Sequence, residues 1–211
     1  MKTEHRRHAH DGDHTIDRPR AYEVFSALGF LGRRREIFTR LAALSGVRPG
    51  ASVLDVGCGT GYLTRLLAPV AGPSGRVTGV DPSEAMIGYA RERAPRNCDY
   101  RVAGGQSLGL PDAAFDVVVS TLAVHHIPEG ERATALHEMA RVLRPGGRLL
   151  IAEARPPAGR LPGRVAATFF PALRHGVRDE LGGLIEQAGL RPVDSGDLPV
   201  LLGYVRAERP E

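Results

Sequence analysis

Short apolar runs alternate with amphipathic segments along most of the chain, and this alternation is the main structural signal. Runs rich in valine, leucine and isoleucine have the length and composition of buried strands, whereas apolar residues at three- and four-residue spacing predict helices. The expected strands are 52–56, 76–81, 100–103, 115–120, 148–153, 191–195 and 200–207. The expected helices beyond the first strand are 62–70, 83–94, 131–143 and 177–188.

The order of these elements indicates an α/β fold. Continuous apolar strands separated by helices are typical of a mainly parallel, doubly wound sheet that is covered on both faces. The last two strands have no helix between them, so we expect an antiparallel edge. Residues 21–45 precede the first strand, and their apolar spacing predicts two helices divided near Gly29 and Gly32. We therefore expect one domain over residues 21–211.

Residues 1–20 differ from the rest of the chain because they contain almost no apolar side chains. We interpret this segment as a disordered or mobile tail, since it cannot bury enough surface to order itself. The tail is rich in histidine, and the alternative interpretation is adventitious binding of Zn or Ni. Its histidines are His5, His8, His10 and His14. No other pattern suggests a metal, so we expect no metal site.

Composition and charge exclude several classes of protein. The 211 residues fit a single domain, and 42% hydrophobic residues are enough for a packed core. The net charge is +4, but the basic residues are scattered, and we interpret the cluster Arg33–Arg35 as a solvated helix face. We therefore expect no nucleic-acid partner.

Location and redox state follow from similar arguments. No apolar run approaches the ~20 residues of a membrane span, and the N-terminus lacks the apolar core of a secretory leader. Cys58 and Cys98 are the only cysteines, which is too few for a disulfide framework. We expect a cytoplasmic protein that is a monomer or a homodimer.

A glycine-rich loop follows the first strand and points to a nucleoside ligand. Glycines at 57, 59 and 61 permit a tight turn and a close approach of the backbone to a ligand. The third glycine comes one residue too early for a dinucleotide fingerprint, and Asp55 would repel a pyrophosphate but suit an ammonium group. Asp81 ends the second strand, where a carboxylate can accept both hydroxyls of a ribose. S-adenosylmethionine (SAM) meets both conditions.

Four ordered segments then resemble the class I SAM-dependent methyltransferases. They are VLDVGCGTGYLTRLLA (53–68), VTGVDPSEAM (77–86), LPDAAFDVVVSTLAVHHIP (110–128) and RVLRPGGRLLIAEA (141–154). The sequence is most similar to the small bacterial group related to ubiquinone/menaquinone-biosynthesis methyltransferases. The resemblance implies a seven-stranded Rossmann-like sheet in the order 3-2-1-4-5-7-6. It also implies that residues 21–45 form a lid and that residues 155–176 form a variable acceptor region.

The resemblance also implies which residues contact the cofactor. It places Asp55 and the glycine loop around the methionine moiety, Asp81 on the ribose, and Pro82 and Met86 against the adenine. The whole implied set is Asp55, Gly57, Cys58, Gly59, Gly61, Asp81, Pro82, Met86, Gly105, Gln106 and Thr121. One position departs from the family, because Gly104 stands where an aspartate usually accepts from the adenine amino group. Gln106 or a water molecule would then substitute.

Two adjacent histidines, His125 and His126, follow the fourth strand at the edge where ligands bind in such sheets. One of them could take a proton from a phenol, an enol or a hydroxyl, and we favour His126 as this base. The alternative is that both are structural. Ser120–Ala123 replaces the Pro-Pro motif of related amino-directed nucleic-acid methyltransferases, which argues against base methylation.

These observations together predict methyl transfer from SAM to oxygen or carbon of a small, partly hydrophobic acceptor. Aromatic side chains from the lid and the acceptor region would line the acceptor pocket, although they could equally be ordinary core. They are Tyr22, Phe25, Phe30, Phe169 and Phe170. One alternative is a SAM-binding protein without methyl transfer. Another, a nicotinamide oxidoreductase, is disfavoured by the glycine spacing and by Asp55.

Overall fold

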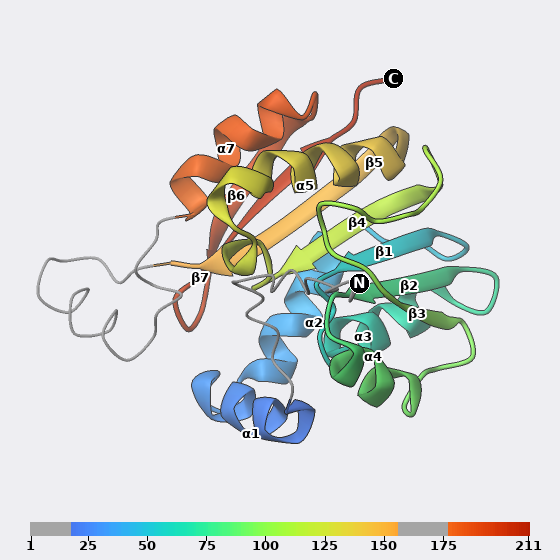
Figure 1. The fold of residues 1–211 in the computed structure, drawn as a ribbon, viewed down its shortest axis with the longest axis vertical. Coiled ribbons are helices and arrows are strands. Elements are labelled where there is room, and N and C mark those ends of the chain that lie inside the picture. The colour runs from blue at the N-terminus through green and yellow to red at the C-terminus, as the bar shows by residue number, and fades with distance from the viewer. Residues whose placement is uncertain (1–17, 156–176) are drawn as a thin grey trace, which may run out of the picture.

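Seven strands form one sheet in the order β3-β2-β1-β4-β5-β7-β6, with helices on both faces (Figure 1). The structure is a computed structural model that describes residues 18–155 and 177–211. The strands are β1 (Ser52–Val56), β2 (Arg76–Asp81), β3 (Cys98–Val102), β4 (Phe115–Thr121), β5 (Leu143–Ala154), β6 (Arg191–Leu198) and β7 (Leu202–Glu208). Strands β1 to β5 pair in parallel, and β7 runs antiparallel to both β5 and β6. The predicted fold class and strand order are confirmed.

The helices cover the sheet in two layers. They are α1 (Pro19–Gly29), α2 (Arg34–Leu44), α3 (Tyr62–Ala71), α4 (Glu84–Arg91), η1 (Val124–His126), α5 (Glu129–Val142) and α7 (Val177–Gln187). Alternate residues of β1 divide between the layers: Val53 packs with α2 and α3, whereas Leu54 and Val56 pack with α5 and α7. This two-residue alternation places every second side chain of a strand on the same face.

Local sequence signals fix several element ends. The Ser83 hydroxyl accepts a hydrogen bond from the Met86 backbone N–H at 3.2 Å, so Ser83 is the N-cap of α4 as expected. Gly46 takes a positive φ of 72° directly after α2, which a side chain would disfavour. These two signals mark the end of α2 and the start of α4, and α4 follows directly on the end of β2.

The start of β5 differs from the prediction. Pro145-Gly146-Gly147 was expected to separate a helix from a strand beginning at Arg148, but β5 already begins at Leu143. Its pairing with β4 shifts register between Phe115 and Val117, so the Pro-Gly-Gly segment forms an irregularity within the strand. Such a bulge accommodates proline and glycine without ending the ladder.

Some predictions fall outside the described residues. These include the histidine-rich tail up to residue 17, residues 156–176 of the acceptor region with Phe169 and Phe170, and the side chain of Phe25. Within the described part of the chain, no helix is long and apolar enough to cross a membrane. In that same part, no group of three or more His, Cys, Asp or Glu side chains could hold a metal ion.

Candidate cofactor and active site

The glycine loop connects β1 to α3 at the carboxyl edge of the sheet, and its three glycines have different surroundings. All three take positive φ values, 72°, 52° and 73° for Gly57, Gly59 and Gly61. A Cβ on Gly57 would lie 2.2 Å from the Cβ of Ala123, and one on Gly61 would lie 2.6 Å from the hydroxyl of Tyr100. At Gly59 nothing lies within 4 Å. The outer glycines are therefore needed for packing, while the middle one faces open space.

Asp81 joins this loop to the start of α4. Its Oδ2 accepts the Gly59 N–H at 2.9 Å, and its Oδ1 accepts the Ser83 N–H at 3.0 Å. Burial raises the pKa of this carboxyl group, and the two backbone hydrogen bonds oppose that rise. Since a carboxylate has about four acceptor positions, each oxygen can still accept a further hydroxyl group. This geometry suits a vicinal diol such as a ribose.

Asp55 lies deeper than the loop. Asp55 belongs to β1, and its buried side chain faces α3, where its Oδ2 accepts a hydrogen bond from the Thr64 hydroxyl at 2.6 Å. Burial raises the pKa of Asp55 to about 7, while the Thr64 hydrogen bond opposes the shift. This contact anchors α3 to β1. A contact between Asp55 and an ammonium group stays a prediction.

The expected adenine side is partly preformed. Met86, in the first turn of α4, is buried, whereas Pro82 just before the helix is exposed. The side chain of Gln106 folds back over Gly104, since a Cβ on Gly104 would lie 2.8 Å from the Gln106 Oε1. An amide therefore occupies the neighbourhood of the missing aspartate. Gly105 is buried, and a Cβ there would lie 3.2 Å from Ile127.

Cys58 and Thr121 complete the expected cofactor set. Burial raises the pKa of the Cys58 thiol well above its usual value, and the side chain packs with Tyr100 and Ile87, which agrees with a packing role. The Thr121 hydroxyl at the end of β4 is buried without a hydrogen-bond partner in the described part of the chain. A buried hydroxyl without a partner is costly, so a ligand group that bonds to it would stabilise the site.

Helix α1 is tied to the glycine loop through Glu23, a residue that the sequence analysis missed. The Glu23 carboxylate accepts two hydrogen bonds from Arg34, at 2.7 and 3.2 Å, and one from the Thr60 hydroxyl. The Arg34 guanidinium in turn lies 3.8 Å from the ring centroid of Tyr62. Tyr22, next to Glu23, has a pKa raised mainly by burial, and Asp81 is among the charges that act on it.

This contact corrects the interpretation of Arg33–Arg35 as a solvated face. Arg33 and Arg35 are exposed, but Arg34 is buried, with 7% of its surface accessible. The helical spacing of the sequence contained the signal, because Arg34, Ile37 and Leu41 recur at intervals of three and four residues and share one face. A guanidinium on an apolar helical face needs an acidic partner, and Glu23 supplies it.

The two histidines lie in the turn after β4, and Glu153 from the end of β5 holds this turn. Glu153 is 2% exposed. Its Oε1 accepts the backbone N–H groups of Ala123 and Val124 at 3.1 and 2.7 Å, and its Oε2 lies 2.7 Å from the Nδ1 of His125. The ring of His126 lies beside that of His125, with centroids 4.0 Å apart.

The hydrogen bond to Glu153 fixes the role of each nitrogen of His125. A carboxylate can only accept here, so Nδ1 carries the proton, and Nε2 is left as the acceptor in the neutral ring. Glu153 was not among the expected site residues. Ala123, whose N–H it holds, is also the residue that contacts Gly57, so this turn and the glycine loop lie against each other.

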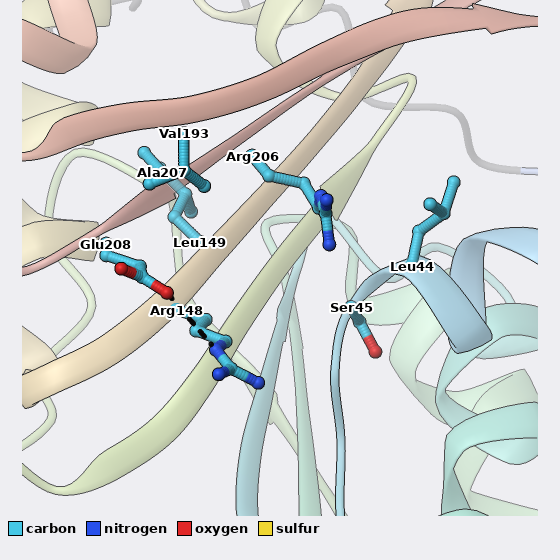
Figure 2. Close-up of a pocket in the computed structure, with 8 residues that line it drawn as sticks. All are labelled: Leu44, Ser45, Arg148, Leu149, Val193, Arg206, Ala207 and Glu208. Atoms are coloured by element: carbon cyan, nitrogen blue, oxygen red, sulfur yellow. Dashed lines mark ion pairs between the residues drawn. The ribbon is translucent and has the colours of Figure 1, made fainter.

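A separate pocket lies at the opposite edge of the sheet (Figure 2). Its volume is about 340 Å³. Its lining consists of Leu44, Ser45, Arg148, Leu149, Val193, Arg206, Ala207 and Glu208. Its charges are already paired, Arg148 with Glu208 at 3.5 Å and Arg206 with Asp194 at 2.7 Å. None of the glycine-loop residues lines this pocket, and its arginines are paired within the described part of the chain.

Comparison with known proteins shows which proteins this fold and sequence resemble. Residues 53–147 match the family of methyltransferase domains. A SAM-dependent methyltransferase from Aquifex aeolicus superposes with a TM-score of 0.73 at 23% identity, covering 90% of this chain and 98% of that one. Over residues 53–147 the chain thus resembles a methyltransferase domain, and its fold is that of the SAM-dependent methyltransferases, a class whose cofactor is SAM.

The relatives in sequence are more specific. The ubiquinone/menaquinone biosynthesis C-methyltransferase UbiE of Ectopseudomonas mendocina is 40% identical over 131 residues. The protein of the same name from Hydrogenovibrio crunogenus is 34% identical over 137 residues. These alignments cover 60% and 63% of this chain, but only 50% and 53% of the relatives. The domain is therefore related to UbiE, while the chain spans about half the length of the curated relatives that it matches.

The same fold also occurs in a protein named for a different reaction. The [4+2]-cyclase SpnF superposes with a TM-score of 0.68 at 22% identity, covering 83% of this chain and 81% of that one. At this identity the likeness concerns the fold alone. The fold is thus compatible with more than one chemistry, and the reaction has to be argued from the site.

Proposed function

We propose that this chain transfers the methyl group of SAM to oxygen or carbon of a small, partly hydrophobic acceptor, and that His125 takes the acceptor's proton. The observation that carries the proposal is the contact of His125 with the buried Glu153, in a turn that lies against the glycine loop. An imidazole held in one tautomer beside the cofactor loop is suited to general base catalysis.

The cofactor-binding roles follow from the loop geometry. The carboxylate of Asp81 would accept the ribose hydroxyls, and the open space over Gly59 would admit the ligand close to the backbone. The Thr121 hydroxyl and the Gln106 amide would bond to the remaining polar groups. Bound SAM supplies an electrophilic methyl group on a positively charged sulfur.

The protein's own part in the reaction is to orient the acceptor and remove one proton. The Nε2 of His125 accepts the proton from an O–H or acidic C–H group of the acceptor. The electron pair left on the acceptor forms the bond to the methyl carbon while the carbon–sulfur bond breaks, and the leaving group is a neutral thioether. The sequence favoured His126 as the base, whereas the hydrogen bond to Glu153 favours His125.

Helices α1 and α2 would act as a lid over the cofactor. This proposal is supported by the contact of Glu23 with Thr60 in the glycine loop and by the half-buried Tyr22, on which the charge of Asp81 acts. A closed lid excludes water, which would otherwise compete with the acceptor for space and for hydrogen bonds. The names of the UbiE relatives favour a quinone precursor as the acceptor.

Turnover to S-adenosylhomocysteine with a panel of phenols, enolisable quinols and unrelated amines tests the proposal. We expect product with a phenolic or enolic acceptor and a label from the SAM methyl group in that acceptor. Tight SAM binding with no transfer to any member of the panel would instead support the alternative, a SAM-binding protein without methyl transfer.

The cytoplasmic location and the monomeric or dimeric state stay predictions.

A further inference from the structure

The outward face of α1 carries an apolar stripe that packs against nothing in the described structure. Val24, Leu28 and Leu31 are 60%, 66% and 78% exposed. Their spacing of four and three residues places them on one side of the helix and its end. The sequence pattern predicts an apolar helix face here, and the fold leaves this face in solvent instead of burying it.

The acidic residue of α1 lies on the face that meets the domain, so the solvent-facing side of the helix is apolar. Glu23, its one acidic residue, turns toward Arg34 and Thr60. Phe30 at the end of the helix is buried and stacks edge-on against Phe38. The face that meets the domain is therefore satisfied, and the opposite face has no acid on it.

Arginines border the stripe at both ends. Arg18 and Arg20 lie at the start of α1, Arg20 four residues before Val24, and Arg35 lies in the first turn of α2. All three are exposed, and none forms an ion pair within the part of the chain that the structure describes. The nearby exposed acid, Glu36, is already paired with Arg33 and Arg40. The surface around the stripe is thus basic.

Leu31 adds a conformational argument. It has a φ of 50°, which is unfavourable for a residue with a side chain, and yet its side chain projects into solvent. Leucine contributes nothing to the fold at such a position, and strained residues of this kind are concentrated at functional sites. An exposed leucine at the end of a helix with arginines beside it is suited to insertion into an apolar environment.

We propose that the stripe of Val24, Leu28 and Leu31, with Arg18, Arg20 and Arg35 around it, docks α1 on an anionic lipid surface. An amphipathic helix with arginines beside its apolar face binds at the interface of a bilayer for two reasons. Its apolar side chains are buried in the lipid, and its arginines are attracted to anionic headgroups. Three side chains are too few for the roughly 800 Å² per partner that a stable protein dimer buries. A second copy of this chain is therefore the less suitable occupant.

The inference goes beyond methyl transfer, because binding to lipid requires neither SAM nor an acceptor. Its consequence for the proposed reaction is geometric. The inner face of α1 touches the glycine loop through Glu23, so docking of the outer face would hold the glycine loop one helix away from the membrane surface. An apolar acceptor dissolved in the lipid would then be concentrated close to the site.

Co-sedimentation with vesicles tests the proposal on the full chain. We expect binding to vesicles that contain phosphatidylglycerol, weaker binding at high salt, and little binding to pure phosphatidylcholine. The double variant Leu28→Ser/Leu31→Ser should lower the partition coefficient about ten-fold or more. Replacing Arg18 or Arg20 by glutamine should lower it about five-fold each.

The matched control replaces an exposed valine outside α1. Val193 on β6 is 43% exposed, so Val193→Ser removes apolar surface away from the stripe and should bind vesicles like the wild type. Val24→Ser serves as a milder second variant, and circular dichroism verifies the fold of each. The proposal is overturned if the wild type does not bind anionic vesicles or if the stripe variant binds as well as the control. A wild-type dimer that the stripe substitutions dissociate would also overturn it.

Discussion

Glu153 distinguishes the two adjacent histidines by its contact with His125. It is buried at the end of β5, and three groups of the η1 turn point at its two oxygens. Removing such a carboxylate leaves the imidazole free to rotate or to change tautomer, and so weakens the base without touching the acceptor. In the proposed mechanism Glu153 is a positioning residue that acts through His125.

The base itself gives the first prediction. His125→Ala should lower kcat by about 10²–10⁴-fold and leave the affinity for SAM unchanged, because a positioned base contributes that much to proton removal. His126→Ala, the natural control, should retain most of the rate. If His126→Ala loses the rate and His125→Ala keeps it, the assignment from the Glu153 contact is wrong.

Glu153→Gln gives the second prediction. Glutamine keeps the size of the side chain but adds an N–H donor, so it cannot accept from Ala123, Val124 and His125 together. We expect a fall in kcat of roughly ten- to a hundred-fold with little change in KM, and partial recovery in Glu153→Asp. A purely structural role would instead lower the melting temperature of Glu153→Gln and leave kcat of the folded fraction unchanged.

At the scale of elements, the contact between Glu23 and Thr60 anchors α1 to the glycine loop. Glu23 reaches Thr60 across 37 positions of the chain, and its charge is neutralised by Arg34. Burial of this ion pair is only partial, so its net stabilisation is modest. Its effect should be visible in cofactor binding more than in global stability.

A double-mutant cycle measures this anchor. Glu23→Ala and Thr60→Val should each weaken SAM binding about five-fold, as expected for one hydrogen bond worth about 1 kcal/mol. The double variant should be no weaker than either single variant, because both remove the same contact. Glu36→Gln, which breaks only exposed pairs on α2, is the control and should bind SAM normally. Additive losses would mean that the two residues act separately.

The bounds of the strands show how far a single sequence predicts the elements. Strands β1, β2 and β4 are runs dense in valine, bounded by turn residues, and their positions were predicted to within about one residue. The start of β5 was not, because Pro145-Gly146-Gly147 is a stop signal that the sheet accommodates as a bulge. The strand order came from the resemblance, since apolar periodicity does not encode which strands are neighbours.

The site was predictable only where its chemistry is local. The glycine loop and Asp81 lie at strand ends, so the alternation of elements brings them to one edge. Glu153 lies 28 positions from His125 and Glu23 lies 37 positions from Thr60, and neither pair has a local sequence signal. The buried side of Arg34 could have been found from its helical spacing with Ile37 and Leu41.

At the scale of the whole molecule, the buried carboxyl groups make stability depend on pH. Burial raises the pKa of Asp55 to about 7, and it raises that of Asp81 as well. A raised carboxyl pKa means that the folded state binds more protons than the unfolded state between the two pKa values. The stabilisation is complete below the unfolded value near 4 and is lost as the pH rises through about 7.

Urea unfolding at several pH values tests this dependence. The free energy of unfolding should fall by a few kcal/mol at most between pH ~5 and pH ~8, at roughly 1.4 kcal/mol per unit of pKa shift. Asp55→Asn should flatten this fall, since it keeps the size of the side chain and removes the ionisation. Asp99→Asn, on the exposed surface of β3, is the control and should retain the wild-type slope. A steeper slope in Asp55→Asn would contradict the account.

The central claim is that the glycine loop and Asp81 form a SAM site, and calorimetric titration with SAM tests it most directly. The account predicts that the wild type binds SAM and not NAD, and that Asp81→Ala weakens SAM binding about ten- to a hundred-fold, the loss of a charge-assisted hydrogen bond. Asp99→Ala should bind like the wild type. Unchanged SAM affinity in a folded Asp81→Ala variant would contradict the account, as would binding of NAD in place of SAM.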